Sequence, residues 1–279
     1  MHTPVLLSET INALEVKKDG AYIDATAGES GHLIPIAKSG GKVLAIDWDN
    51  EQIKNLELKV KNLNNVTLVA GNFADIVGIA KTEGFSGCSG ILFDLGLSVS
   101  QIKHSGRGFS FKNLDEPLDM RLGKDIEQTA TQLITSSSEE SLYEIFAGFS
   151  EEINSLAISR AVYRANRRKK IQKVKDLIAA INEVVADRPE KTYARIFQAL
   201  RIAVNNEFEN LKSGLVGAKD LLKKDGRLVV ISFHSLEDRI VKKFMQSQKD
   251  FKILKKTIGR HEHSHSFERS AIVRVAIKL

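Results

Sequence analysis

The chain has 279 residues, of which 42% are hydrophobic and 27% are charged, and these proportions are ordinary for a globular protein that buries one large core or two smaller ones. No apolar run reaches the length of a membrane span, and the first ten residues lack the basic start and apolar centre of a signal peptide, so we expect a cytoplasmic protein with no membrane partner. The single cysteine, Cys88, excludes an internal disulfide and a multi-cysteine zinc site, whereas the net charge of +6 is compatible with a nucleic-acid partner.

After a short amphipathic helix over residues 4–14, the sequence predicts a nucleotide-binding turn. A buried strand over residues 21–25 leads into a turn that contains Gly28 and Gly31, and helix-forming sequence follows. Glycines allow such a turn to bend tightly and to approach an anionic or nucleotide ligand closely. Asp24, at the end of the strand, distinguishes this turn from those that bind NAD, because an acidic group there suits a ligand with an ammonium and a sulfonium, as in S-adenosylmethionine.

The following elements extend a doubly wound sheet. A second apolar run ends in Asp47, about 20 residues after the turn, where an acidic residue can accept hydrogen bonds from ribose hydroxyls. A helix over residues 50–62 and a third strand over residues 66–70 come next. Phe73 follows that strand, and it either stacks on an adenine ring or closes the core; the sequence leaves both alternatives open.

A fourth buried strand, over residues 88–95, carries Asp94 near its end. In open α/β sheets the chemistry takes place beyond the carboxyl ends of the strands, so Asp94 is placed for function. The alternative is that Asp94 caps the next helix, but Ser98 and Ser100 are better placed for that cap.

The pattern changes after residue 102, because no apolar strand run occurs between residues 103 and 192. The segment over residues 104–121 is rich in Gly, Asp, Asn and Arg and reads as an ordered, functional loop, in which we expect Phe109 and Phe111 to be exposed. Helical patterns follow, so the sequence predicts a small helical domain inserted into the sheet. The expected helices cover residues 127–134, 138–146, 153–163 and 174–185.

A basic run lies between two of these expected helices. Residues 160–175 contain eight basic residues and no acidic one, with Tyr163 among them. Such a run is either a solvated face or a surface that contacts a phosphate backbone, and we favour the second because arginine dominates its centre.

The last part of the chain returns to the sheet. We expect a long helical region over residues 194–224, a fifth strand over residues 228–233 that ends at His234, and a helix over residues 236–245. Two closing strands are expected over residues 251–255 and 270–279. The loop between them holds three histidines at alternate positions, His261, His263 and His265, for which a flexible polar loop is favoured over metal binding, so no metal ligand is predicted.

Stretches in order along nearly the whole chain carry a resemblance to a known family. They are HTPVLL, YIDATAGESGH, AIDWD, GNF, DLGLSVSQ, RGFSF, PLDMR, FQALRIAVNNE, ISFHSLEDRIVK and RSAIVRVA. On these stretches the chain resembles the MraW/RsmH family, the cytosine-N4 methyltransferases of small-subunit ribosomal RNA. The resemblance implies an α/β fold, the class I (Rossmann-like) methyltransferase sheet with an inserted small helical domain. It implies S-adenosylmethionine as the cofactor and a decoding-centre cytosine of 16S rRNA in the small ribosomal subunit as the substrate.

The resemblance also assigns residues to the cofactor site. Carried over by motif, Ser30, Gly31 and His32 would line the methionine end, beside Asp24 and Gly28 of the same turn, Asp47 would hold the ribose, Phe73 would flank the adenine, and Asp94 and Gln101 would complete the pocket. The chain departs from the family where a further glycine is usual at Glu29 or Ser30, where Ser-Ser-Pro-Gln is usual at residues 98–101, and where His-Pro-Ala-Thr-Arg is usual before FQALR.

Three residues are candidates for the group that accepts the proton of the cytosine N4 amine: Asp94 first, then His234, then Asp119. We expect Phe109 or Phe111 to stack on the target base, and Arg107 and Arg121 to hold its phosphates. The basic run adds Arg164, Arg167 and Arg168 to the expected RNA contacts.

The expected domains are a cofactor-binding domain over residues 1–102 and 193–279 and an inserted RNA-recognition domain over residues 103–192. Two other functions stay open, a DNA amino-methyltransferase and a non-catalytic RNA-binding assembly factor. The first is disfavoured because DLGLS lacks the two prolines of the DNA-type motif, and the second because the cofactor pocket looks intact. A homodimer is neither indicated nor excluded.

Overall fold

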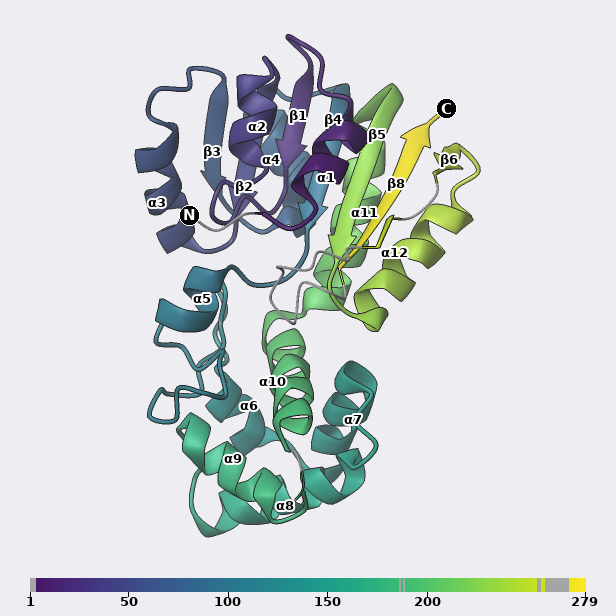
Figure 1. The fold of residues 1–279 in the computed structure, drawn as a ribbon. Helices are drawn as coiled ribbons and strands as arrows, with labels where there is room; N and C mark the ends of the chain where they lie inside the picture. Colours follow the sequence, from purple (N-terminus) through teal and green to yellow (C-terminus); the bar gives the residue numbers. More distant parts are fainter. Residues whose placement is uncertain (1–3, 186, 188, 255–256, 259–270) are drawn as a thin grey trace. The chain divides into compact units, whose positions relative to one another are not determined.

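The computed structural model describes residues 4–279 except 186, 188, 255–256 and 259–270. The chain divides into two compact units (Figure 1). The sheet unit comprises Met1–Leu97 and Phe208–Leu279, and the helical unit comprises Ser98–Glu207. Within the described residues, every helix is too short or too polar to cross a membrane.

The sheet unit is built on one mixed sheet with the strand order β3-β2-β1-β4-β5-β8-β6, and β7 pairs with β8. Strands β1 to β5 run parallel, whereas β8 is antiparallel to β5 and to β6 and β7. This is the order and direction of the class I methyltransferase sheet, as expected. The strands are β1 (Ala21–Asp24), β2 (Lys42–Asp47), β3 (Val66–Ala70), β4 (Cys88–Asp94), β5 (Leu222–Ser232), β6 (Phe251–Ile253), β7 (Thr257–Ile258) and β8 (Ile272–Lys278).

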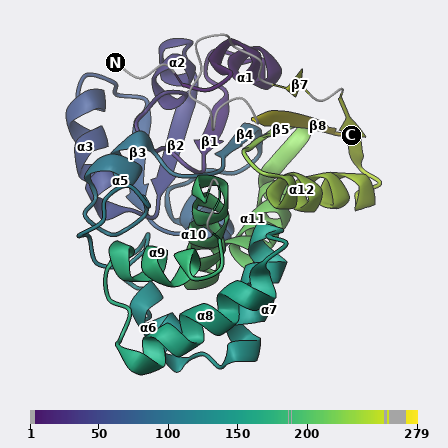
Figure 2. The same cartoon turned by 60° about the horizontal axis from the view of Figure 1, so that its bottom comes forward.

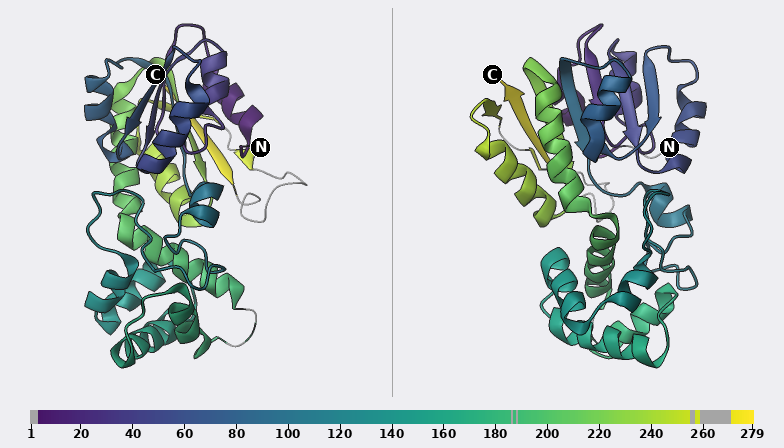
Figure 3. Two further views of the ribbon diagram at one scale, coloured as in Figure 1. Left: turned by 90° about the vertical axis from the view of Figure 1, so that its left-hand side faces the viewer. Right: turned by 180° about the vertical axis from the view of Figure 1, so that it is seen from behind.

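Helices cover both faces of this sheet because successive strand side chains point to opposite sides. On β1, Tyr22 belongs to the hydrophobic core on one face of the sheet, and Ile23 belongs to the core on the other face. One face is packed by α1 (Leu7–Leu14), α2 (Leu33–Lys38) and α3 (Asn50–Val60). The other is packed by α4 (Ile76–Thr82), α11 (Glu207–Leu221) and α12 (Ser235–Ser247), of which α11 and α12 lie in front of the sheet in the right-hand view of Figure 3.

The helical unit is a cluster of helices around its own core. Helix α7 packs against both α8 and α10, and Figure 2 shows α7 and α8 side by side. Among its described residues there is no strand, only an isolated bridge between Pro117 and Lys173. The helices are α5 (Val99–His104), α6 (Ala130–Ser136), α7 (Glu139–Ser150), α8 (Ser155–Arg168), α9 (Val174–Asn182) and α10 (Glu190–Asn205).

The helical unit is longer than the insert expected over residues 103–192. The long helical region expected over residues 194–224 is helical up to Leu221, but Asn206 adopts a left-handed conformation (φ +49°) and divides it into α10 and α11. Helix α10 then packs against α6 and α7 and belongs to the helical unit. Strand β5 also begins earlier than expected, at Leu222 instead of residue 228.

Candidate active site

Three aspartates gather at one edge of the sheet because each is the last residue of a parallel strand. Asp24 ends β1, Asp47 ends β2 and Asp94 ends β4. The pairing of β1 with β2 and with β4 puts their carboxyl ends at the same edge. This edge is where open α/β sheets bind their ligands.

The turn after β1 is tied to Asp47. Gly28 has a left-handed backbone (φ +47°), which favours glycine, and its amide donates to Asp47 Oδ2 at 2.8 Å. The other oxygen, Oδ1, accepts from the amide of Asp49 at 2.8 Å. These bonds orient the Asp47 carboxylate at the end of β2, and the expected ribose contact stays a prediction. Ser30 also has a left-handed backbone (φ +75°), at one of the two positions where the family usually has an additional glycine.

Asp24 is almost completely buried beneath this turn. Burial raises the pKa of its carboxyl to about 7, against the opposing charge of His32 and a hydrogen bond from the amide of Thr26. The negative charges of Asp94 and Asp47 raise the same pKa further. A group of this kind is stabilised in its charged form when a cationic ligand enters.

Asp94 contacts His32 through one carboxylate oxygen only. The Nδ1 atom of His32 lies 3.4 Å from Asp94 Oδ2, and the backbone amide of Asp94 donates to Thr26 Oγ1 at 2.6 Å. The second oxygen, Oδ1, is buried and has no hydrogen-bond partner among the residues that the structure describes. A buried carboxylate oxygen without a donor is costly, so this atom fits a site that is completed by a ligand with a positive charge or an N–H group.

Phe73 takes part in the packing of the sheet unit. Its ring meets the ring of Phe93 edge-on, with centroids 5.5 Å apart, and a side chain on Gly214 of α11 would lie within 2.8 Å of it. Phe73 is nevertheless only half-buried. These contacts support the core-closing alternative, while the adenine contact stays a prediction.

His234 follows β5 and begins α12. Its Nδ1 accepts from the amide of Glu237 at 3.4 Å as an N-cap, and its Nε2 lies 2.9 Å from Glu237 Oε1 without hydrogen-bond alignment. Glu237 Oε2 in turn accepts from the amide of Phe233 at 3.0 Å. Both ring nitrogens of His234 therefore face Glu237, which makes the ring part of a helix cap.

Gln101 lies in the helical unit and caps α5. Its side chain accepts from the amide of Ser98 at 2.9 Å, and Ser98 Oγ accepts from the amide of Gln101 at 3.1 Å. This confirms Ser98, and not Asp94, as the N-cap of this helix. The expected contact of Gln101 with the cofactor stays a prediction.

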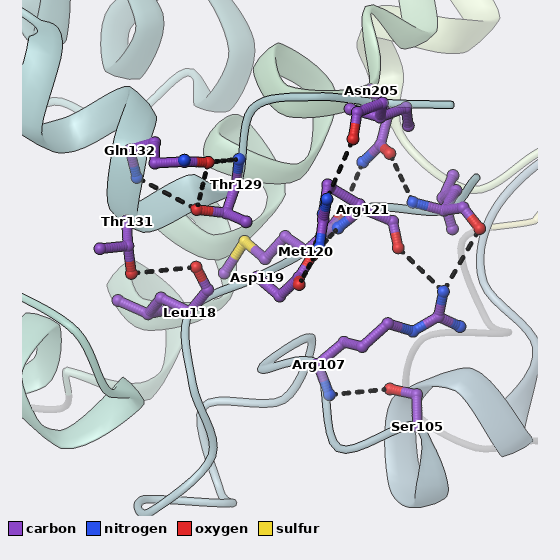
Figure 4. A network of polar contacts seen from close by, with 12 residues as sticks. Ser105, Arg107, Leu118, Asp119, Met120, Arg121, Thr129, Thr131, Gln132 and Asn205 are labelled. Atoms are coloured by element: carbon purple, nitrogen blue, oxygen red, sulfur yellow. Dashed lines mark hydrogen bonds and ion pairs between the residues drawn. The ribbon is translucent and has the colours of Figure 1, made fainter. Parts of the chain in front are cut away.

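Asp119, the third proton-acceptor candidate, is paired with Arg121 (Figure 4). Arg121 donates from Nε to Oδ1 and from Nη2 to Oδ2, both at 2.8 Å. Burial alone would raise the pKa of Asp119, but the hydrogen bonds and charge of Arg121 outweigh it and lower this pKa. A carboxylate with a lowered pKa is a weak base, so the structure favours a structural role for Asp119.

Arg107 also makes contacts inside the helical unit. Its Nη1 donates to the carbonyl oxygens of Arg121 at 2.9 Å and Leu122 at 3.3 Å, and its guanidinium lies 5.3 Å from the ring centre of Phe109. These contacts hold the two ends of the segment between Arg107 and Leu122 together. The expected phosphate contacts of Arg107 and Arg121 stay predictions.

The expectation that Phe109 and Phe111 are exposed is wrong. Phe109 is buried, and Phe111 packs between Tyr193 and Phe197 with ring centres 5.8 and 6.2 Å away. Glycine-rich sequence around them resembled a solvent-exposed loop, but both rings contribute to the folded helical unit. Phe111 is half-buried, and the role of either ring in stacking on RNA stays a prediction.

Asn205 is an organising residue that the sequence did not single out. Its side-chain amide donates to the carbonyl oxygens of Met120 and Arg201 and accepts from the amide of Leu122, all at 2.8 Å (Figure 4). Met120 between these contacts has a left-handed backbone (φ +61°). The Asn-Asn pair before Glu207 was the available signal, because asparagine often occurs at helix ends of this kind.

The basic run lies on the end of α8 and the segment that follows it. Arg160 pairs with Glu139 and Arg168 with Glu183, at 2.9 and 2.6 Å. Arg164 and Arg167 are exposed and have no ion-pair partner among the described residues. The surface formed by Arg164 and Arg167 is therefore available to a polyanion.

The three histidines at positions 261, 263 and 265 lie outside the described residues. Among the residues that are described, no group of three or more side chains could hold a metal ion.

Comparison with known proteins places the sequence in a family. A family model described as the MraW methylase family matches residues 1–278. A protein from Desulfotalea psychrophila named ribosomal RNA small subunit methyltransferase H is 38% identical over 292 residues, which cover 100% of this chain and 98% of that protein. The protein of the same name from Thermosipho melanesiensis is 38% identical, with 100% and 98% covered, and the one from Thermomicrobium roseum is 41% identical, with 88% and 77% covered.

Proposed function

Because this chain belongs to the MraW methylase family, we propose that it transfers a methyl group from S-adenosylmethionine to the N4 amine of a decoding-centre cytosine in 16S ribosomal RNA. The names of the relatives support methylation of small-subunit ribosomal RNA. The choice of N4 and of the decoding centre rests on the motifs PLDMR, RGFSF and ISFHSLEDR.

S-adenosylmethionine is the cofactor, and when bound it supplies an electrophilic methyl group. The residues at the edge of the sheet fit it, since the partnerless Asp94 Oδ1 and the buried Asp24 suit a cationic ligand. Asp47, already oriented by the turn, would hold the ribose, and Phe73 would flank the adenine. The Ser30-Gly31-His32 segment would hold the methionine end.

The observation that carries the proposed chemistry is the free oxygen of Asp94. Cytosine N4 is a poor nucleophile because its lone pair is delocalised into the ring, so an acceptor for one of its protons favours the attacking form. Asp94 Oδ1 lies at the carboxyl end of a central strand and has acceptor capacity that no described residue uses. Asp94 is therefore our first choice, ahead of His234 and Asp119, whose side chains are engaged in a helix cap and an ion pair.

The RNA would be held by the helical unit. Arg164 and Arg167 provide exposed positive charge for the phosphate backbone, with Arg168 beside them. The target base has to be single-stranded or turned out of a helix before an amine on its edge can reach the cofactor.

The proposal is tested by methyl transfer from labelled S-adenosylmethionine to small ribosomal subunits from a strain that lacks this gene. Digestion to nucleosides should give label in N4-methylcytidine. Asp94→Asn should reduce turnover by at least about a hundredfold, whereas Lys54→Ala, on the exposed side of α3, should leave it unchanged. Label in another nucleoside, or cofactor binding without any label, would overturn the assigned substrate. If the wild-type protein does not bind the cofactor at all, the result would favour an assembly factor.

A further inference from the structure

We propose that His32 is a positioning residue, protonated on both ring nitrogens, which joins Asp94 to the segment Pro4–Leu6 and leaves Oδ1 as the one oxygen of the Asp94 carboxylate that meets a ligand. This inference rests on the proposed function for the identity of that ligand. The protonation of His32, in contrast, concerns the protein alone and can be tested without any ligand.

The two partners of His32 determine where its protons are. Nε2 lies 3.2 Å from the carbonyl oxygen of Val5, which can only accept, so Nε2 carries a hydrogen. Nδ1 lies 3.4 Å from Asp94 Oδ2, and because a carboxylate would repel a lone pair on Nδ1, we place a hydrogen on Nδ1 as well. A histidine that donates from both nitrogens is an imidazolium.

The charges around His32 support that form. Asp94 faces it from the end of β4 and Asp24 from the end of β1, and Asp47 at the end of β2 acts on Asp24. Burial alone would lower the pKa of His32, but the hydrogen bond and charge of Asp94, with the charge of Asp24 and the Val5 carbonyl, hold it above its ordinary value.

The segment Pro4–Leu6 is held over the glycine turn. A side chain on Gly31 would come within 2.6 Å of Cβ of Pro4, so the backbone of the turn and the proline are in close contact. Leu6 is buried, and it precedes α1 as its N-cap residue with a left-handed backbone (φ +52°). The hydrogen bond from His32 to Val5 therefore fixes a segment that packs directly on the turn.

This arrangement gives Asp94 two differently used oxygens. Oδ2 faces the imidazolium of His32, whereas Oδ1 has no partner among the described residues. The imidazolium also balances the charge of Asp94. Without the imidazolium, the uncompensated charge of Asp94 would attract a ligand that carries an additional positive charge more strongly than a ligand that lacks this charge.

The first measurement is nitrogen NMR of the histidine rings in the cofactor-free protein at pH 7, with the signals of His32 identified by their absence in His32→Gln. We expect both ring nitrogens to be protonated. A neutral ring with a hydrogen on one nitrogen would overturn the proposal, including the case in which the proton resides on Asp94. Failure of the proposed function would not affect this result.

The second measurement compares the affinity of S-adenosylmethionine with that of S-adenosylhomocysteine, which lacks the sulfonium charge. His32→Gln should weaken the binding of both, and it should shift the ratio of their dissociation constants by at least about threefold in favour of S-adenosylmethionine. A loss of packing alone would weaken both equally, and an unchanged ratio would therefore overturn the charge-balancing role. His104→Gln, at an exposed position of α5, should change neither affinity.

Discussion

Arg121 binds both carboxylate oxygens of Asp119 through two parallel hydrogen bonds of 2.8 Å each. Arg121 also donates to the carbonyl oxygen of Ile126 at 3.1 Å. The pair thus stabilises the fold of the segment that carries PLDMR. From the sequence alone, Asp119 was a candidate proton acceptor and Arg121 a candidate phosphate ligand.

Asp119→Asn should destabilise the helical unit by about 1–2 kcal/mol, because the paired charge is lost while the shape is kept. Turnover at a temperature where the variant is folded should fall by less than about tenfold. Chemical denaturation and methyl transfer check the two effects. A loss of turnover comparable with that of Asp94→Asn, without a loss of stability, would return Asp119 to the list of catalytic groups.

The stability that Asp119 contributes should also depend on pH. Its pKa is lowered in the folded protein, so the contribution is present above the unfolded pKa of about 4 and is lost as the pH falls through the folded value. Wild type and Asp119→Asn should therefore differ in unfolding free energy at pH 7 and converge below about pH 4. A difference that persists undiminished at low pH would contradict the role of the charge.

Asn205→Ala should destabilise the protein by about 2–4 kcal/mol, since it removes three hydrogen bonds and leaves the amide of Leu122 and the carbonyl of Met120 without this partner. Asn206→Gly is the matched control next to it. Asn206 is exposed and has a positive φ, which glycine adopts without strain, so this change should be neutral or slightly stabilising. Equal effects of the two substitutions would show that the network around Asn205 is not important for stability.

The strands of the sheet were predictable because their signals are local. Buried apolar runs bounded by turns placed β1 to β4 within one residue, and the position of Asp24, Asp47 and Asp94 at strand ends followed directly. Chain order and helix periodicity were enough to predict the doubly wound sheet.

The helical unit was less predictable because its decisive features depend on tertiary contacts. The break between α10 and α11 is made by one left-handed asparagine inside sequence that otherwise continues as a helix. Phe109 and Phe111 looked exposed because glycine and polar residues surround them, and only their packing partners, such as Tyr193 and Phe197, show otherwise. Likewise, no local signal indicates that His32 contacts Val5, 27 residues earlier.

Arg164→Ala and Arg167→Ala together should weaken RNA binding at all sequences and reduce its dependence on salt. Each lost phosphate contact lowers the slope of log K against log salt concentration by about 0.7–0.9, so the double variant should differ from wild type by about 1.5. Filter binding of an rRNA fragment at several salt concentrations measures this. Lys54→Ala, which removes an exposed charge paired with Glu51, should leave the slope unchanged. An unchanged slope for the double variant would exclude these arginines from the interface.

Asp24 should make the cofactor-free protein less stable as the pH rises. Its folded pKa of about 7 is raised above the ordinary value of 3.8, so the folded protein binds more protons than the unfolded chain between about pH 4 and pH 7. Unfolding free energy therefore falls over this range and the effect of Asp24 levels off above it. Asp24→Asn, which is neutral at every pH, should have a melting temperature at pH 8 that is at least about 2–4 °C above that of wild type.

The same Asp24→Asn variant should bind S-adenosylmethionine more weakly, because a buried carboxylate that a cation would stabilise has been removed. Thermal scans at pH 5 and pH 8, with and without cofactor, separate the effect on stability from the effect on binding. If Asp24→Asn is less stable than wild type at pH 8 without cofactor, the charge of Asp24 does not destabilise the folded protein.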